Sequence, residues 1–587
     1  MPKTPFVTHL RLILLLAAGL GLTGPAHVWS QGLPTGTRSR VIVEFRGAPD
    51  VRIITGSGGV ARRQLAGMKA QVADLDPGVL PSIAGNPQVA SIRPDHPVFA
   101  TLERTGAAIA ATIARRSFGL TGKGIGVAVI DSGITAWHDD LYLTDPASPR
   151  SDPRIVHFRD FTTDNIPGVW ASDQPIDVYG HGTHVAGVIA GNGFDSDGRR
   201  MGIAPEAHLI GLKVLDGEGN GYISDVIAAL DYAVTVKDVY NIRVINLSVA
   251  SGVFESYNTD PLAQAARRAV QAGIVVVAAA GNLGLNDEGE EQWGGITCPG
   301  NAPWVLTVGA ASHEGTRPRS NDIVAGFSSR GPTWIDFAAK PDLIAPGVGT
   351  ESLADPNSTL YTMYGDYLLD GTRSTPYRPY LSLSGTSMAA PAVAGTIALM
   401  LEANPSLTPN AVKAILQYTA EVRDDEPALA QGAGLLNTLG AVRMARAFGS
   451  PDEPLPEPGD TIENEFIAWS EQIIWGNRRI AGGDLRPGAN AWALTTTWGA
   501  RATARRRPIV WGTRGDDNIV WSTRGDDNIV WSTRGDDNIV WSTRGDDNIV
   551  WSTRGDDNIV WSTNTAGQVL WPADQPVDNR RRVTGTH

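Results

Sequence analysis

Short apolar runs alternate with longer helical segments across the middle of the chain, from Gly119 to about Phe448. The runs are rich in Val, Ile, Leu and Ala and cover residues 127–130, 208–214, 244–247, 274–280 and 305–308. Runs of this kind predict buried parallel strands, and the segments between them predict crossover helices. The pattern therefore predicts an α/β fold in which helices flank a parallel sheet.

A smaller pattern precedes this one, between residues 40 and 100. It predicts a strand at residues 41–45, a helix-like stretch near residues 62–75 and a second strand near residues 89–98. Together these elements predict a small α+β unit.

The first 30 residues carry a third pattern. The basic residues Lys3 and Arg11 precede an apolar run at residues 12–22, and small residues follow this run up to position 30. This order predicts a secretory signal peptide at residues 1–30, so we expect a secreted or extracellular mature protein. The run is shorter than the roughly 20 apolar residues that cross a bilayer, and we expect no membrane span in the mature form.

Beyond residue 448 the composition changes twice. A proline-rich, acidic segment at residues 449–462 predicts a linker. Residues 463–587 form a tryptophan-rich C-terminal region, with five copies of a ten-residue repeat at residues 511–560. In each copy Asn-Ile-Val-Trp-Ser-Thr predicts a strand and Arg-Gly-Asp-Asp predicts a tight turn.

The repeats predict a separate β-rich module from Glu463 onwards. Strand alternation would place Ile519, Trp521 and Thr523 on one face, and stacked identical copies would form ladders of tryptophan, isoleucine and charge. Two alternatives stay open, namely a low-complexity tail without a fold and a cell-adhesion role for the repeated Arg-Gly-Asp.

Charge and cysteine content narrow the classes of function. The 49 basic and 62 acidic residues give a net charge of -13, which disfavours nucleic acid as a partner. The single cysteine, Cys298, excludes an intramolecular disulfide and any multi-cysteine metal cluster. We interpret Cys298 as a small buried apolar residue.

An aspartate and a histidine stand where a catalytic pair is expected. Asp131 follows an apolar run in Val-Ile-Asp-Ser-Gly-Ile, which places its carboxylate at the carboxyl end of a parallel strand. His181 opens Gly-His-Gly-Thr-His-Val-Ala-Gly at the start of a helix, where a carboxylate could fix its tautomer for general-base catalysis. A helix-cap or turn aspartate is the alternative for Asp131. His184 lacks the spacing and the glutamate of zinc-binding helices, so we interpret it as a buried structural histidine.

A serine and an asparagine complete the set. Ser387 lies in Leu-Ser-Gly-Thr-Ser-Met-Ala-Ala-Pro, a glycine turn that leads into an apolar helix, and a serine N-cap is its alternative reading. Asn282 follows the apolar run at residues 274–280, where its amide could donate to a tetrahedral oxyanion.

The order Asp131, His181, Ser387, with these flanking residues, resembles the subtilisin family, or subtilases. The resemblance covers roughly residues 119–448 and includes Gly-Ile-Ala-Pro at residues 202–205 and Lys-Pro-Asp-Leu-Ile-Ala-Pro-Gly at residues 340–347. It implies a catalytic domain at residues 116–448 that hydrolyses peptide bonds through a triad and an acyl-enzyme, without a cofactor.

The resemblance also implies partners and processing. Protein or peptide substrates are expected, and residues 31–115 are expected to be an inhibitory propeptide that the enzyme itself removes, releasing a domain that begins near Ser117. The C-terminal region would then be dispensable for peptide hydrolysis and would serve location or partner binding.

Two positions depart from the family in the segments that bind substrate. The strand expected to pair with substrate reads Ser248-Val249-Ala250, with alanine where relatives have glycine, and Thr297 takes the expected floor of the primary specificity pocket. Both changes imply a shallower pocket that prefers side chains of the size of leucine.

Structural calcium is common in the family, and Asp140 matches a ligand position. The loop at residues 191–198 does not keep the usual pattern, although Asp195 and Asp197 offer oxygen ligands. An ordinary solvated acidic loop is the alternative, and no metal ligand is assigned.

The main alternative function is a binding or adhesion protein that has an inactive protease domain and acts through its C-terminal repeats. The intact triad argues against this alternative. A lipase or esterase would show a Gly-x-Ser-x-Gly elbow, which Ser387 lacks.

Overall fold

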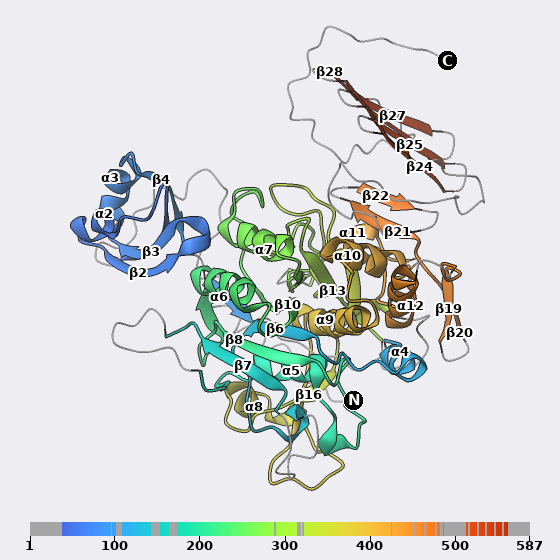
Figure 1. The fold of residues 1–587 in the computed structure, drawn as a ribbon, viewed down its shortest axis with the longest axis horizontal. Helices are drawn as coiled ribbons and strands as arrows, with labels where there is room; N and C mark the ends of the chain where they lie inside the picture. The colour runs from blue at the N-terminus through green and yellow to red at the C-terminus, as the bar shows by residue number, and fades with distance from the viewer. Residues whose placement is uncertain are drawn as a thin grey trace. The chain divides into compact units, whose positions relative to one another are not determined.

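The chain divides into two compact units, the first ending at Asp95 and the second beginning at His96 (Figure 1). For residues 97–100, 474–475, 478–481 and the described parts of the repeat region between residues 512 and 560, only the backbone is described. The computed structural model describes residues 38–95, 97–100, 109–142, 153–163, 173–286, 289–313, 319, 322–423, 425–450, 454–462, 465–475, 478–481, 485, 512–514, 517–524, 527–534, 537–544, 547–554 and 557–560.

The first unit is a four-stranded antiparallel sheet in the order β2-β3-β1-β4, with its own apolar core. Its elements are β1 (Ser39–Phe45), α2 (Val51–Gly56), β2 (Val60–Leu65), β3 (Ala70–Leu75), α3 (Leu80–Ala84) and β4 (Val89–Pro94). The small α+β unit and its first strand are confirmed.

The helix-like stretch predicted at residues 62–75 is wrong, because β2 and β3 occupy it. Leu65, Val72 and Leu75 recur at spacings that suit a helix, but β3 pairs antiparallel with β1, where Val41 lies opposite Ala73. Pairing between distant segments overrides the local periodicity. The strand predicted at residues 89–98 ends at Pro94.

The second unit is built on a mostly parallel sheet in the order β14-β13-β12-β10-β6-β8-β7, with β15 paired to β13. All five predicted strands are confirmed, whereas β7, β14 and β15 were not predicted. The strands are β6 (Gly126–Asp131), β7 (Ile155–Asp160), β8 (His208–Lys213), β10 (Ile242–Leu247), β12 (Val275–Ala279), β13 (Leu306–Ser312), β14 (Ile323–Val324) and β15 (Leu343–Pro346).

Helices cover both faces of this sheet (Figure 1). Helices α5 and α9 pack against each other, and α6 packs against α7. The chain runs from β6 to the edge strand β7, returns through α5 to β8, and then crosses β6 to reach β10 and β12 through α6 and α7. The helices are α4 (Ala111–Phe118), α5 (His181–Ala190), α6 (Ile223–Val236), α7 (Pro261–Gln271), α8 (Thr359–Met363), α9 (Thr386–Ala403), α10 (Pro409–Tyr418), α11 (Ala428–Gln431) and α12 (Thr438–Gly449).

Helix α9 is long and apolar enough to cross a membrane by composition. However, 89% of its 18-residue window is buried inside the protein. Its apolar character is therefore explained by its place in the core, between the sheet and α5.

Residues beyond 448 contribute to this core. Hairpin β19 (Gly459–Ile462) and β20 (Glu465–Ala468) packs near α12, and the same apolar cluster that contains α9 includes Ile462, Ile467, Trp469, Ile473 and Leu485. Asp460 accepts hydrogen bonds from the Asn437 Nδ2 (2.7 Å) and Trp469 Nε1 (2.6 Å) atoms. A boundary at residue 448 therefore leaves part of the core outside the catalytic unit.

Three smaller sheets complete the second unit. One has the order β11-β5-β9, another the order β16-β18-β17, and the third joins β21 to β22. Their strands are β5 (Pro97–Ala100), β9 (Asn220–Tyr222), β11 (Val249–Ala250), β16 (Thr350–Leu353), β17 (Leu368–Leu369), β18 (Tyr380–Leu383), β21 (Gln472–Trp475) and β22 (Arg478–Ala481).

The repeats form a six-stranded antiparallel meander, which agrees with the predicted β-rich character. Its strands are β23 (Gly512–Arg514), β24 (Asp517–Arg524), β25 (Asp527–Arg534), β26 (Asp537–Arg544), β27 (Asp547–Arg554) and β28 (Asp557–Val560). The predicted tryptophan ladder is wrong, because the register places Trp521 opposite Val530 and Val520 opposite Trp531. Neighbouring strands run in opposite directions, so identical repeats do not align residue for residue.

Candidate active site

Asp131 and His181 meet at the carboxyl edge of the central sheet. Asp131 is the last residue of β6 and His181 the first residue of α5. The Asp131 Oδ1 atom lies 2.7 Å from the His181 Nδ1 atom, and both side chains are fully buried. A carboxylate at this nitrogen fixes the ring orientation and leaves Nε2 as the nitrogen for proton transfer. The structure thus brings the predicted acid and base together.

A second buried carboxylate, Asp177, holds the start of α5 and was not predicted from the sequence. It accepts hydrogen bonds from the Ser132 hydroxyl (2.8 Å), the Gly180 N–H (2.8 Å), and the backbone N–H (2.8 Å) and hydroxyl (2.7 Å) of Thr183. Ser132 follows Asp131, and Gly180 precedes His181. Asp177 therefore connects the strand end that carries the acid to the helix start that carries the base.

Ser387 is the second residue of α9, and Gly385 is the N-cap of that helix. The alternative reading of Ser387 as an N-cap is therefore wrong. Its hydroxyl donates to the Ser248 carbonyl (3.2 Å), and the Ser248 hydroxyl donates to the Ser387 carbonyl (2.9 Å). Asn246 Nδ2 in turn donates to the Ser248 hydroxyl (2.9 Å). These bonds fix the nucleophile candidate against the end of β10.

Asn282 is oriented by the residue that precedes Ser387. The Asn282 Oδ1 atom accepts from the Thr386 N–H (3.0 Å) and from the Thr386 hydroxyl (2.9 Å). Because both donors hold the oxygen, the Nδ2 group is the end of the amide that can donate to another oxygen. Gly281, before it, has φ +101, a left-handed conformation that glycine adopts without strain. The asparagine is thus preorganised as a donor next to the serine.

A short strand lies between two others beside these residues. In the backbone register β5 is antiparallel to both neighbours, with Ala100 opposite Val249, Phe99 opposite Ala250 and Val98 opposite Gly221. Strand β11 is the segment that the sequence assigns to substrate pairing. A peptide segment of this chain thus occupies the middle position of the three-stranded sheet.

The predicted pocket floor lies directly behind the oxyanion candidate. A Cβ atom at Gly281 would come within 2.7 Å of the Thr297 Cγ2 atom, so Thr297 packs against this glycine. Thr297 donates from its N–H to the Ala280 carbonyl (3.0 Å). Ser251 and Cys298 form an isolated antiparallel bridge, which joins the Thr297 segment to the end of the substrate-pairing strand. The structure therefore brings Ser248, Val249, Ala250 and Thr297 into one region.

His184 is held by the backbone of two other segments. Its Nε2 lies 3.0 Å from both the Thr350 and Leu381 carbonyl oxygens, and burial lowers its pKa to about 3. A histidine that stays neutral and holds two backbone carbonyls has a structural role. Cys298 is also buried, and burial raises the pKa of its thiol. The role of His184 and the burial of Cys298 agree with their sequence interpretations, but Cys298 is not purely apolar, because its thiol donates to the Asp260 Oδ1 atom (3.2 Å).

The residues considered for calcium separate into two groups. Asp140 and Asp195 are buried together, whereas Asp197 is exposed and bonds to Thr372 and Arg373. The third group near the buried pair is the imidazole of His138. Calcium takes six to eight oxygen ligands, and a nitrogen donor beside two carboxylates does not suit it. The described residues of this cluster do not fit a calcium site.

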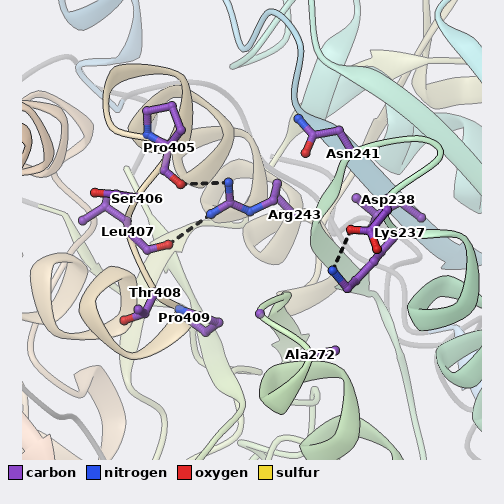
Figure 2. Close-up of a pocket in the computed structure, with 12 residues that line it drawn as sticks. Lys237, Asp238, Asn241, Arg243, Ala272, Pro405, Ser406, Leu407, Thr408 and Pro409 are labelled. Atoms are coloured by element: carbon purple, nitrogen blue, oxygen red, sulfur yellow. Dashed lines mark hydrogen bonds and ion pairs between the residues drawn. The ribbon is translucent and has the colours of Figure 1, made fainter.

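A separate hollow of about 270 Å³ lies near the opposite edge of the sheet (Figure 2). It is lined by residues that precede or begin β10, by the end of the α7 segment and by the turn before α10. The Arg243 guanidinium spans it and donates to the Pro405 (3.0 Å) and Leu407 (3.1 Å) carbonyls. None of the predicted site residues lines this hollow, which is therefore distinct from the site at the carboxyl edge.

Comparisons with known proteins agree with this geometry. A model described as the subtilase family matches residues 122–441. Serine protease AprX of Bacillus subtilis (strain 168) is 38% identical over 343 residues, which cover 58% of this chain and 70% of that protein. Subtilisin E of the same organism is 31% identical over 393 residues, covering 67% and 85%.

A solved structure is similar in fold. The crystal structure of fervidolysin from Fervidobacterium pennivorans, described as a keratinolytic enzyme related to subtilisin, matches with a TM-score of 0.53 and 19% identity. The match covers 89% of this chain and 72% of that one. At this identity it supports the fold alone.

Proposed function

The chain belongs to the subtilase family and is a subtilisin-type serine protease, and we propose that Asp131, His181 and Ser387 form its catalytic triad. The observation that carries the assignment is the buried 2.7 Å contact between Asp131 and His181, made where β6 ends and α5 begins. The family match covers all three residues, and α9, which presents Ser387, packs directly against α5.

The chemistry follows from these positions. His181 accepts the proton of the Ser387 hydroxyl as that oxygen attacks the peptide carbonyl, and Asp131 stabilises the imidazolium that forms. Asn282 Nδ2 and the Ser387 backbone N–H donate to the oxyanion of the tetrahedral intermediate. The imidazolium then protonates the leaving amine, and water hydrolyses the acyl-enzyme with His181 again as base.

Substitution of the triad tests this proposal. Ser387→Ala and His181→Ala should each lower kcat for a chromogenic peptide by about 10⁶, and Asp131→Ala by about 10⁴, values that were measured on subtilisin itself. Turnover by the parent protein also separates the enzyme from an inactive binding or adhesion protein. Unchanged turnover in Ser387→Ala would contradict the assignment.

We further propose that the segment before the catalytic unit is an inhibitory propeptide. The support is that β5, which follows the first compact unit, occupies the middle position between β9 and β11. A peptide held there by backbone pairing blocks the place that a substrate strand would take. The first unit has an apolar core of its own, as expected for a segment that folds as a separate domain.

The backbone register suggests where self-processing occurs. The antiparallel pairs approach the end of β10 as the chain reaches Ala100, so a cut shortly after Ala100 fits the geometry better than one near Ser117. Helix α4 also belongs with the catalytic core, because Ala111 and Ala114 are buried and Ala114 is part of its apolar cluster. Mass spectrometry of the secreted protein distinguishes the two sites, and Ser387→Ala should accumulate precursor. The same cut in Ser387→Ala from a protease-free host would contradict self-processing.

Secretion and substrate preference complete the proposal. We propose export by a signal peptide at residues 1–30, which lies outside the described residues, and protein or peptide substrates. The packing of Thr297 against Gly281 supports a shallow pocket. Thr297→Gly should therefore raise kcat/KM for tryptophan relative to leucine at the position before the cleaved bond. A peptide library that ranks arginine first for the parent enzyme would contradict this preference.

A further inference from the structure

Three buried side chains outside the catalytic site come together from two segments of the second unit. His138 is the N-cap of the short helix at Asp139–Leu141, Asp140 lies within that helix, and Asp195 lies in the short helix at Phe194–Ser196 that follows α5. One potential ligand atom from each residue lies within 4.8 Å of the other two. His138 and Asp140 are fully buried and Asp195 is 1% exposed.

Asp195 carries the argument because its carboxylate is buried without a hydrogen-bond partner. Neither of its oxygens has a donor within hydrogen-bond distance. An isolated buried carboxylate is costly unless a cation or a proton compensates it.

His138 is held in the tautomer that a metal ligand needs. Its Nε2 atom lies 3.0 Å from the Pro379 carbonyl oxygen, which can only accept, so Nε2 carries the proton. The Nδ1 atom then has the lone pair, and its one contact is a long bond of 3.2 Å from the Asp140 N–H. A metal ligand histidine commonly donates its other ring N–H to a backbone carbonyl in this way.

The carboxylate of Asp140 is oriented by two hydrogen-bond donors and can still bind a metal ion. Its Oδ2 atom accepts from the Tyr380 hydroxyl (2.8 Å) and its Oδ1 atom from the Asp195 N–H (2.9 Å). Each carboxylate oxygen has two lone pairs, so one on each remains for a metal. Hydrogen bonds to a ligating carboxylate are typical of metal centres.

We propose that the Nδ1 atom of His138 and the carboxylates of Asp140 and Asp195 bind one divalent transition-metal ion, with Zn²⁺ as the best match. An imidazole with carboxylates suits zinc, whereas calcium requires more oxygen ligands than this cluster offers. A water completes the fourth position, and the ion displaces the long Asp140 N–H contact to Nδ1. The ion joins the segment after β6 to the segment after α5, the elements that carry Asp131 and His181, in a chain that has no disulfide.

Metal binding to the full-length chain tests this proposal without relying on proteolysis. The chain carries Ser387→Ala to prevent self-digestion, is dialysed against a chelator, and is then loaded separately with Zn²⁺, Co²⁺ or Ca²⁺. We expect one Zn²⁺ retained per chain after a second dialysis, a rise in Tm with Zn²⁺ that exceeds the rise with Ca²⁺, and visible absorption of the Co²⁺ form. His138→Ala and Asp195→Asn should each weaken Zn²⁺ binding by about 100-fold or more.

A neighbouring acid provides the matched control. Asp197→Asn removes an exposed carboxylate from the same loop and should bind Zn²⁺ like the parent chain. In the presence of chelator, Asp195→Asn should have a Tm equal to or above the parent, because it removes a buried unpaired charge, and this shows that the variant folds. Loss of zinc in Asp197→Asn, equal binding in Asp195→Asn, or a larger Tm rise with Ca²⁺ than with Zn²⁺ would overturn the proposal.

Discussion

Trp469 provides a direct test of whether the region after residue 459 belongs to the catalytic unit. Its side chain is 4% exposed and its Nε1 atom donates to Asp460 (2.6 Å). Its ring makes an edge contact with Tyr418 at 6.1 Å between centroids, and the Arg443 guanidinium lies 5.5 Å from the ring. Removal of a buried Trp side chain to Ala costs about 3–5 kcal/mol.

The Trp469→Ala variant should therefore lower the Tm of the full-length chain by about 5–10 °C. Thermal unfolding in the Ser387→Ala background measures this without self-digestion. Trp469→Phe keeps most of the ring but loses the bond to Asp460, so it should lose about 1–3 kcal/mol. Trp334→Ala, which removes a tryptophan that is 56% exposed, is the matched control and should leave the Tm nearly unchanged.

Truncation extends the same reasoning. A chain ending at Pro458 loses five buried core side chains and the partner of Asn437, so it should not yield folded, active protease. A chain ending at residue 499 keeps these side chains and loses the repeats, so it should retain peptide turnover. An unchanged Tm in Trp469→Ala together with full turnover of the chain ending at Pro458 would refute the packing argument.

Two further predictions concern buried charges. Burial lowers the pKa of Lys340 to about 7, despite its 2.8 Å contact with Asp342, whereas the unfolded side chain titrates near 10.5, so the unfolded chain binds more protons between these pH values. The free energy of unfolding should therefore rise with pH across this window, by at most about 1.4 kcal/mol per pH unit. Chemical unfolding of Lys340→Met at pH 7, 8 and 9 should show a weaker dependence of stability on pH than the parent chain. Asp177→Asn should lose about 2–4 kcal/mol of stability and lower kcat at least about 10-fold with little change in KM, because four N–H and O–H donors that orient the His181 segment lose a charged acceptor. A kcat equal to that of the parent enzyme would show that Asp177 does not position the base.

The proposed catalytic residues could be selected from the sequence because each lies in a local pattern. Asp131 ends an apolar strand and His181 starts a helix of small residues, so their elements could be placed without knowledge of distant contacts. Asp177 was missed, since nothing in its neighbourhood indicates that it will accept bonds from both Ser132 and Thr183. The proposed zinc site was predicted only in part, because the sequence suggested Asp140 and Asp195 as metal ligands but not His138. A spacing of more than 50 residues between ligands carries no periodic signal.

The repeat region shows a different limit of sequence reasoning. The sequence showed the ten-residue period and the strand in each copy. A ladder of identical side chains, however, requires neighbouring strands to run parallel or to align in identical register. The structure instead pairs Arg524 with Asp527 across a two-residue connection, which reverses the chain and sets Trp521 opposite Val530. Each copy consists of an eight-residue strand and a two-residue connection, and it runs antiparallel to the copy before it. The length of the connection, and not the repeat itself, therefore determines which residues of adjacent strands lie opposite each other. The same register places an arginine opposite an aspartate at successive strand ends, and opposite charges at paired positions favour this antiparallel register.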